Sequence, residues 1–246
     1  MAAGSTTPTT PTTGFATPAV VSTSRVPRLE PGDRLTSAEF ERRYETMPEL
    51  KKAELIEGVV YMPSRVRMDA HAGPHADLLT WLGTYRSATP GINAGDNATL
   101  KLDNDNVPQP DALLLIDAQL GGQVTIDASG YINGAPELVA EIASSSVSID
   151  LHAKLQVYRR SGVREYIAWR VLDRAIDWFI LRDGEYLPLQ AGDDGILRSE
   201  VFPGLWLNAP AMLDGKLDVV LATLQQGIAT PEHKNFVARI GRQRSE

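Results

Sequence analysis

The chain carries an acid and a lysine at positions where charged side chains are costly. Glu141 stands within Leu138–Ala143, an otherwise apolar run of strand length. Such a run is typical of a strand buried on both faces, where an ionised side chain needs a paired charge or a metal ion. Lys154 falls on the apolar stripe of the helix expected to follow, which Leu151 and Leu155 define. The pattern indicates a charged site inside the fold.

A second acid, Asp111, stands at the mouth of another expected strand, Ala112–Ile116. An aspartate there can simply complete the Pro-rich turn that precedes it. With Glu141 on a nearby strand, however, two converging carboxylates are what a hard divalent cation requires. Asp111 and Glu141 are therefore candidate metal ligands.

Two more acids lie in Ala53–Met62, which is expected to form either a strand pair or a bent strand around Gly58. Glu54 and Glu57 are three residues apart, and on a regular strand they lie on opposite faces, so only one can face the interior. The residues leave open which one does, and whether both are solvated near the turn.

The next polar segment, Ser64–His75, carries Arg65 and Arg67, which are candidate phosphate contacts or solvated surface. His75 opens the helix that follows. Its ring is a candidate contact for a phosphate or a water in a cleft, or alternatively a helix cap or a packed ring.

These residues have to be positioned by a strand, a serine-rich turn, a helix and a second strand over Pro136–Trp169. Ser148 or Asp150 is expected to cap the helix, and Gly162 to end it. Asp150 alternatively pairs with Lys154 four residues later.

Length and composition allow one sizeable domain with extensions, because 246 residues with 43% hydrophobic content can bury a full core. Residues 1–30, rich in Thr and Pro, are expected to form a disordered tail. The folded domain is expected over residues 31–213. Residues 214–246 are expected to add a helical extension, whose amphipathic helix suits an interface or a lid.

Hydropathy, cysteine content and net charge exclude several classes of protein and of binding site. The sequence has no apolar run of about 18 residues, which excludes a membrane-spanning segment, and no secretory signal is recognisable at its start. The absence of cysteine excludes disulfides and thiolate zinc sites, and fits the reducing cytoplasm. A net charge of -7 argues against avid, non-specific coating of nucleic acid, although it permits a local basic groove.

The ordered segments AELIEG, QPDALLLI, GAPELVAEIASSS and IDLHAKLQVYRRSGVREYI, with His75 opening a helix after the first, resemble the Uma2 family of restriction-endonuclease-like proteins. That family belongs to the PD-(D/E)XK nuclease superfamily, and the resemblance covers about Tyr44 to Leu213. It implies an α/β (α+β) fold with a restriction-endonuclease-like core, a mixed sheet flanked by helices. It also implies a homodimer.

For the site, the resemblance implies that Asp111 and Glu141 ligate Mg²⁺ (or Mn²⁺), with Glu54 as the third acid. The superfamily lysine ordinarily lies two positions after the strand acid, where this chain has Ala143. The Uma2 pattern instead has an Asp and a Lys on the next helix, which match Asp150 and Lys154.

The function implied is a Mg²⁺-dependent endonuclease that hydrolyses phosphodiester bonds of DNA. Glu54 would hold a metal-bound water or a second ion, and Lys154 would orient the attacking water and stabilise developing negative charge. The different-class alternative is a catalytically inactive nuclease-fold module for binding or assembly, which the acidic net charge and the displaced lysine allow. A third reading is a metal-dependent hydrolase of a small phosphoester.

Overall fold

A mixed β-sheet forms the centre of the computed structural model, which describes residues 26–62, 67–144 and 146–243 as well as residues 1 and 4. Within this part of the chain, the central sheet has six strands, in the order β11 (Glu185–Pro188), β10 (Ala175–Arg182), β9 (Glu165–Arg170), β8 (Leu138–Ala143), β5 (Ala112–Ile116) and β3 (Ile92–Asp96). Strands β8 and β9 are parallel, and the other neighbours are antiparallel. The predicted mixed sheet flanked by helices is thereby confirmed.

The parallel pair β8 and β9 is joined by a π-helical segment, η3 (Ile149–Lys154), that continues into helix α3 (Leu155–Ser161). All six residues of β8 are buried, as the apolar run predicts. Gly162 ends α3 in the left-handed region at φ +89°, which glycine adopts without a Cβ clash. The expected caps are wrong: Ser148 makes no side-chain bond to the helix start, and Asp150 lies inside η3 with its side chain buried.

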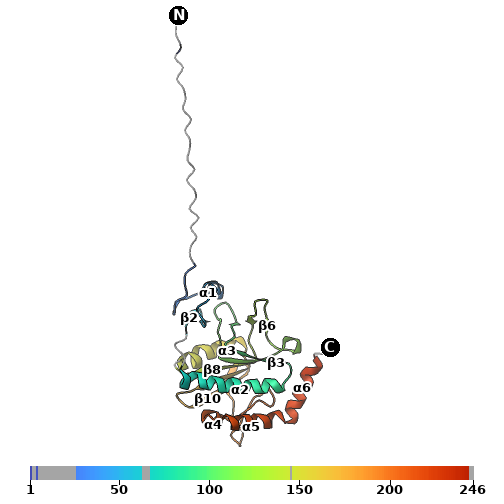
Figure 1. Ribbon diagram of the computed structural model, residues 1–246. Helices are drawn as coiled ribbons and strands as arrows, with labels where there is room; N and C mark the ends of the chain where they lie inside the picture. The colour runs from blue at the N-terminus through green and yellow to red at the C-terminus, as the bar shows by residue number, and fades with distance from the viewer. Residues whose placement is uncertain (2–3, 5–25, 63–66, 145, 244–246) are drawn as a thin grey trace.

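Helices cover both faces of this sheet (Figure 1). One face packs in a single core cluster with helices α2 (Gly73–Ala88), α4 (Ala209–Leu213), α5 (Leu217–Ile228) and α6 (Pro231–Gln243). The opposite face packs with α3 in a second cluster that contains Tyr158 and Tyr166. Side chains alternate between the two clusters along β5: Leu114 belongs to the first, and Leu113 and Leu115 to the second.

The segment expected as a C-terminal extension contributes to the main core. Val220 and Leu224 of α5, and Phe236 and Ile240 of α6, are buried in the same cluster as α2. Near the other end, Leu29 is buried against the small N-terminal cluster, although it falls within the stretch expected to be a tail. Residues 2–3 and 5–25 of that stretch lie outside the described residues.

The N-terminal cluster brings the first acid of the site to the sheet. Helix α1 (Ser37–Tyr44) begins after Thr36, whose Oγ1 accepts a hydrogen bond from the backbone N–H of Glu39. Strands β1 (Glu54–Ile56) and β2 (Val59–Tyr61) form an antiparallel pair, one of the two expected arrangements.

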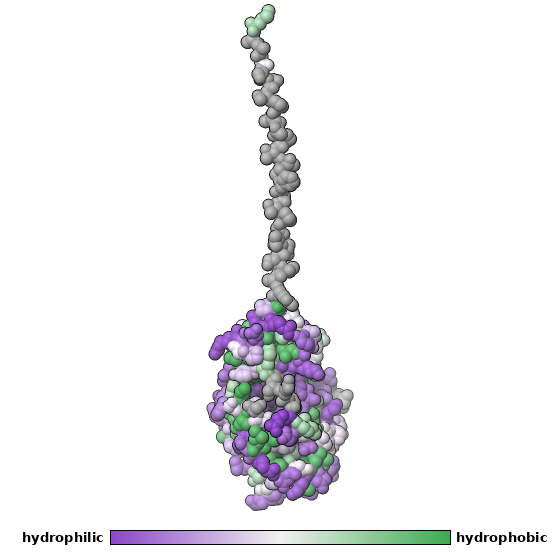
Figure 2. All heavy atoms as spheres, turned by 60° about the vertical axis from the view of Figure 1, so that its left-hand side comes forward, coloured by the Kyte–Doolittle hydropathy of each residue, from purple (hydrophilic) through white to green (hydrophobic). Residues whose placement is uncertain are grey.

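Minor elements complete the described part of the chain. They are the π-helical η1 (Met68–Ala72), the 3₁₀ turn η2 (Ala118–Leu120), a small sheet of β4 (Leu100–Lys101), β7 (Ile132–Asn133) and β6 (Thr125–Ile126), and the pair β12 (Leu197–Arg198) and β13 (Trp206–Leu207). On the face drawn in Figure 2, hydrophilic residues are interspersed with smaller groups of apolar ones. Among the helices of the described residues, none has the length and apolar character needed to cross a membrane.

Candidate metal and catalytic site

Asp111 and Glu141 are neighbours across two strands. Ala112 of β5 pairs with Ala140 of β8, so continuing this antiparallel register by one residue sets Asp111 opposite Glu141. Both acids lie on the α3 face, and both are buried, with exposures of 3% and 2%. The backbone N–H of Ile142 donates to Asp111 Oδ2 over 2.8 Å, which fixes that carboxylate against β8.

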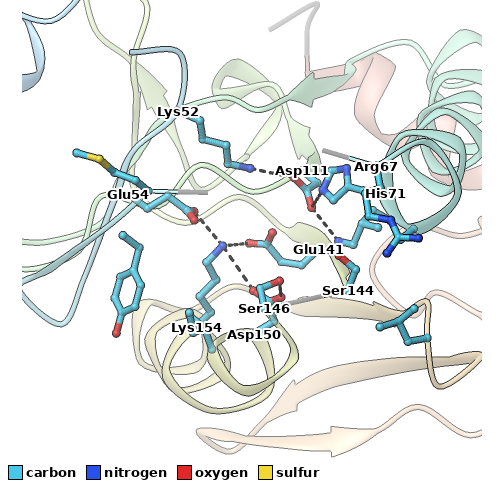
Figure 3. A pocket seen from close by; sticks show the side chains of 16 residues that line it. Lys52, Glu54, Arg67, His71, Asp111, Glu141, Ser144, Ser146, Asp150 and Lys154 are labelled. Carbon is cyan, nitrogen blue, oxygen red and sulfur yellow. Dashed lines mark hydrogen bonds and ion pairs between the residues drawn. The ribbon is translucent and has the colours of Figure 1, made fainter. Parts of the chain in front are cut away.

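Lys154 holds the centre of an acid cluster (Figure 3). Its Nζ lies 2.9 Å from Glu54 Oε1, 2.9 Å from Glu141 Oε1 and 3.6 Å from Asp150 Oδ1. The four side chains come from β1, β8 and η3, and the lysine is 4% exposed. Three distant parts of the sequence therefore meet at one ammonium group.

Two members of the acid cluster, Asp150 and Lys154, lie on the π-helical segment η3. Asp150 and Lys154 are both buried on this segment, and a π turn at the start of a helix is a common feature of functional sites. Ser146 Oγ donates to Asp150 Oδ2 over 2.5 Å, and Tyr158 OH donates to Glu141 Oε1 over 2.8 Å. Tyr158, which is buried in the second core cluster, therefore also orients an acid of the site.

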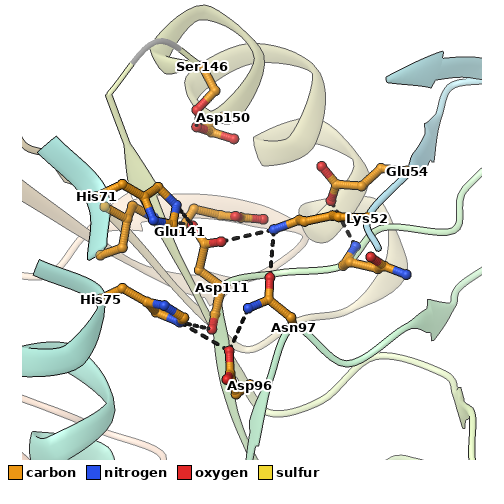
Figure 4. Close-up of polar contacts among 12 residues, drawn as sticks. Lys52, Glu54, His71, His75, Asp96, Asn97, Asp111, Glu141, Ser146 and Asp150 are labelled. Atoms are coloured by element: carbon orange, nitrogen blue, oxygen red, sulfur yellow. Dashed lines mark hydrogen bonds and ion pairs between the residues drawn. The ribbon is translucent and has the colours of Figure 1, made fainter. Parts of the chain in front are cut away.

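A second group of side chains surrounds Asp111 (Figure 4). Lys52 Nζ lies 2.9 Å from Asp111 Oδ1, and His71 Nε2 lies 3.3 Å from Asp111 Oδ2. Lys52 also donates to Asn97 Oδ1 over 2.9 Å. Lys52 is not among the predicted site residues, although its position carries a signal: it stands two residues before Glu54, and alternate residues of an extended chain share a face.

The cluster lines a cavity of about 440 Å³, to which strands β1 and β8 and the π-helical segments η1 and η3 all contribute residues. Most of its charged lining residues belong to the contacts described above. The acids are Glu54, Asp111, Glu141 and Asp150, and the basic side chains are Lys52, Lys154, His71 and Arg67. Figure 3 shows Lys52, Glu54, Asp111 and Lys154 directed toward one another. A cavity of this volume is within the range of small-molecule binding sites.

The other predicted residues lie apart from this cavity or outside the described chain. His75 Nε2 lies 2.7 Å from the Asp111 carbonyl oxygen and 3.2 Å from Asp96 Oδ1. Its ring therefore contacts the start of β5 and the end of β3. Glu57 is exposed, has a left-handed backbone at φ +52° and pairs with Arg160. Of the two candidate acids, Glu54 therefore faces inward. Arg65 lies outside the described residues.

The surroundings of Asp111 and Lys154 hold both side chains in their charged forms. Burial raises the pKa of Asp111, but the hydrogen bond from His71, the charge of Lys52 and the Ile142 N–H together hold it below the usual range of an aspartate. Burial lowers the pKa of Lys154, but Glu141, Glu54 and Asp150 outweigh it and hold that pKa well above its usual range. Asp111 and Lys154 are thus ionised at neutral pH.

The pKa values of Glu141 and Asp150 are shifted toward the neutral, protonated forms. Burial raises the pKa of Glu141 from 4.5 to about 8; Lys154 opposes this shift, and the nearby Asp111, Asp150 and Glu54 reinforce it. Burial likewise raises the pKa of Asp150, again against Lys154. Four carboxyl groups surround two ammonium groups, so the cavity holds an excess of acid that favours either a proton or a further cation.

In the described ranges, no group of three or more His, Cys, Asp or Glu side chains is arranged around one vacant metal position. The reason is visible in the contacts: ammonium groups lie between the carboxylates where an ion would otherwise sit. Mg²⁺ does not need three protein ligands, however, because it keeps several waters and is commonly held by one or two carboxylates and a substrate phosphate.

The family model Uma2, described as "Putative restriction endonuclease", matches residues 37–210. A solved structure described as a "putative nuclease belonging to DUF820", from Anabaena variabilis ATCC 29413, is similar over 71% of this chain and 97% of its own, with a TM-score of 0.54 and 12% sequence identity. At that identity the likeness concerns the fold alone. Among the curated proteins compared, none matches the chain.

Proposed function

The chain belongs to the Uma2 family of restriction-endonuclease-like proteins, and we propose that it is a divalent-metal-dependent endonuclease that hydrolyses phosphodiester bonds of DNA. Membership supports a nuclease; the metal and the DNA substrate are part of the proposal. The observation that carries it is the meeting of Glu54, Asp111, Glu141 and Lys154 at one buried cavity.

The donor chemistry of the site fits Mg²⁺ or Mn²⁺. Asp111 and Glu141 offer hard carboxylate oxygens on adjacent strands, and these two residues with the Ile142 carbonyl would hold the ion. Glu54 would hold a metal-bound water. The cavity has more carboxyl than ammonium groups, and a dication would relieve that excess. When bound, such an ion polarises a phosphoryl oxygen and makes a bound water more acidic.

Lys154 performs the chain's own part of the proposed chemistry. Its ammonium is fixed between Glu54 and Glu141 at 2.9 Å from each, so it needs no reorganisation before the reaction. From this position it orients the attacking water and stabilises the negative charge that develops on the phosphate. Tyr158, which donates to Glu141, keeps the acid in one orientation while this occurs.

The substrate contacts in this proposal lie at the cavity mouth. Arg67 lines the cavity and has a highly exposed side chain, with an exposure of 72%, so its guanidinium can exchange its partner Asp69 for a phosphate. His75 supports the site indirectly, through the Asp111 carbonyl. We further propose that the protein acts in the cytoplasm as a homodimer, as the family resemblance implies and the lack of cysteine allows.

A second candidate is the catalytically inactive binding module. One observation favours it: Asp111 and Glu141, the two proposed ligands, both form ion pairs with lysines at 2.9 Å, so the cluster is already neutralised in part. In such a module these pairs would serve to organise the fold, and the cavity would not bind an ion.

A cleavage assay separates these functions. Supercoiled plasmid and single-stranded DNA are incubated with the wild-type protein, Glu141→Gln and Asp111→Asn, each with Mg²⁺, Mn²⁺ or EDTA. The expected result is metal-dependent cleavage by the wild type that both variants lose by at least about 10²-fold. Glu57→Gln, an exposed acid outside the cavity, is the matched control and retains activity. Absence of cleavage together with absence of Mn²⁺ binding would favour the module.

A further inference from the structure

Three donors hold the Asp111 carboxylate, and they differ in how firmly they are fixed. The Ile142 N–H belongs to the backbone of a buried strand, and His71 extends from the π-helical segment before α2. Lys52 reaches Asp111 Oδ1 on a flexible four-carbon side chain. Of the three, Lys52 has the longest and most flexible side chain, so it can leave Asp111 by side-chain rotation alone.

Lys52 also has a second acceptor in reach. Its Nζ donates to Asn97 Oδ1 over 2.9 Å, and Asn97 is an exposed residue (Figure 4). The Lys52 side chain is 21% exposed, compared with 5% for Lys154, which is enclosed by three carboxylates. The two lysines therefore occupy different positions: Lys154 is locked inside the cluster, and Lys52 stands at its mouth.

We propose that Lys52 is an exchangeable counter-ion of Asp111, which an incoming divalent cation displaces, and that the released ammonium then contacts the substrate phosphate. This inference rests on the proposed function, because it needs Asp111 to be a metal ligand. The Lys52 ammonium and the divalent cation compete for the Asp111 carboxylate, so the lysine lowers the metal affinity of the site. In return, it keeps Asp111 paired inside the protein when no metal is bound.

Metal affinity is the first test, and it does not depend on activity. Mn²⁺ is titrated calorimetrically into the wild type, Lys52→Met, Lys52→Arg and the control Lys51→Met, whose lysine is exposed. Removal of one positive charge beside the ion is expected to tighten Mn²⁺ binding by Lys52→Met about tenfold. Lys52→Arg, which keeps the charge, and Lys51→Met are expected to stay near the wild-type affinity. Thermal unfolding of each variant verifies that it is folded.

The outcomes separate this inference from the proposed function. If neither the wild type nor Lys52→Met binds Mn²⁺ in an Asp111-dependent manner, with Asp111→Asn as the reference, the metal site itself fails and this inference fails with it. If the wild type binds Mn²⁺ and Lys52→Met binds it equally or more weakly, the exchange is refuted while the proposed function stands.

The phosphate contact is tested on the same variants at saturating Mn²⁺. Lys52→Met is expected to cleave DNA at least tenfold more slowly in a single turnover in spite of its tighter metal binding, and Lys52→Arg is expected to restore most of the rate. An unchanged cleavage rate in Lys52→Met would refute the phosphate contact.

Discussion

Lys154 is the residue on which the acid cluster depends most. Its ammonium is within 3.6 Å of Glu54, Glu141 and Asp150, and the three acids are buried. Replacement by Met keeps much of the side-chain volume but leaves these carboxyl groups without their shared cation. A buried charge that loses its partner costs about 3–5 kcal/mol.

We therefore expect Lys154→Met to lower the free energy of unfolding by about 3 kcal/mol and to abolish cleavage. Urea denaturation measures the stability. The control is Lys216→Met, because Lys216 is exposed and pairs with Asp214 at the surface, where a loss within about 0.5 kcal/mol is expected. Equal stability losses in the two variants would contradict the central role of Lys154.

Glu141 makes the stability of the metal-free protein depend on pH. Burial raises its pKa from 4.5 in the unfolded chain to about 8 in the folded one, so the folded state binds this proton more tightly. The stabilisation is fully present below pH 4.5 and is lost as the pH rises toward 8, by at most about 1.4 kcal/mol per pH unit.

The wild type in EDTA should accordingly lose stability between pH 5 and pH 8 relative to Glu141→Gln, whose side chain does not titrate. Urea denaturation across that range measures the difference. Addition of Mn²⁺ should reduce the slope in the wild type, because a bound cation displaces the proton. Parallel pH profiles of the two proteins without metal would show that Glu141 is ionised throughout.

At the scale of elements, the sequence predicts best where a short run has one dominant pattern. The apolar runs at β5 and β8 form strands as expected, and α3 ends at Gly162 as expected. By contrast, β3 (Ile92–Asp96) was not predicted, since Asn, Gly and Asp within it are not typical of strands. This strand is determined by its pairing with β5, which is a tertiary contact.

The residues of the site likewise divide into those with a local sequence pattern and those that only tertiary contacts bring into place. Glu141 and Lys154 stand out in the sequence because a charge on an apolar face is unusual, and the structure brings both to one cavity. The π turns that carry Lys154 and His71 have no local signature, because a shift from one hydrogen-bond spacing to the next depends on packing. Lys52 was missed because a lysine before a strand is common, and its contact with Asp111 joins residues 59 positions apart.

Helix α5 approaches the loop before β13 so closely that one position admits only glycine. A Cβ on Gly227 would overlap the Gly204 carbonyl oxygen and lie 2.7 Å from the Trp206 ring. Gly227→Ala is therefore expected to displace α5 and to cost about 1–3 kcal/mol in thermal or urea unfolding. Gly83→Ala is the matched control, because a Cβ there meets nothing within 4 Å, and it should stabilise α2 by up to about 1 kcal/mol.

At the scale of the whole molecule, the C-terminal helices and the site share one core. Phe236 of α6 is 3% exposed and belongs to the same cluster as α2 and the strands β5 and β8. His233, one turn earlier, lies with its Nε2 2.9 Å from Thr89 Oγ1 at the end of α2. We infer that residues 214–243 unfold together with the rest of the domain, rather than as a separate extension.

Phe236→Ala tests this cooperativity. Removal of a buried phenylalanine costs about 3–5 kcal/mol, and in a single cooperative unit the whole loss appears in the global transition. Unfolding is followed by tryptophan fluorescence and by far-UV circular dichroism, and the two curves should shift together. Asn235→Ala, at the exposed neighbouring position on α6, should leave both curves within about 0.5 kcal/mol of the wild type. Two separate transitions in Phe236→Ala, with the cleavage rate unchanged after the first, would instead identify α6 as an independent appendage that the catalytic domain does not need.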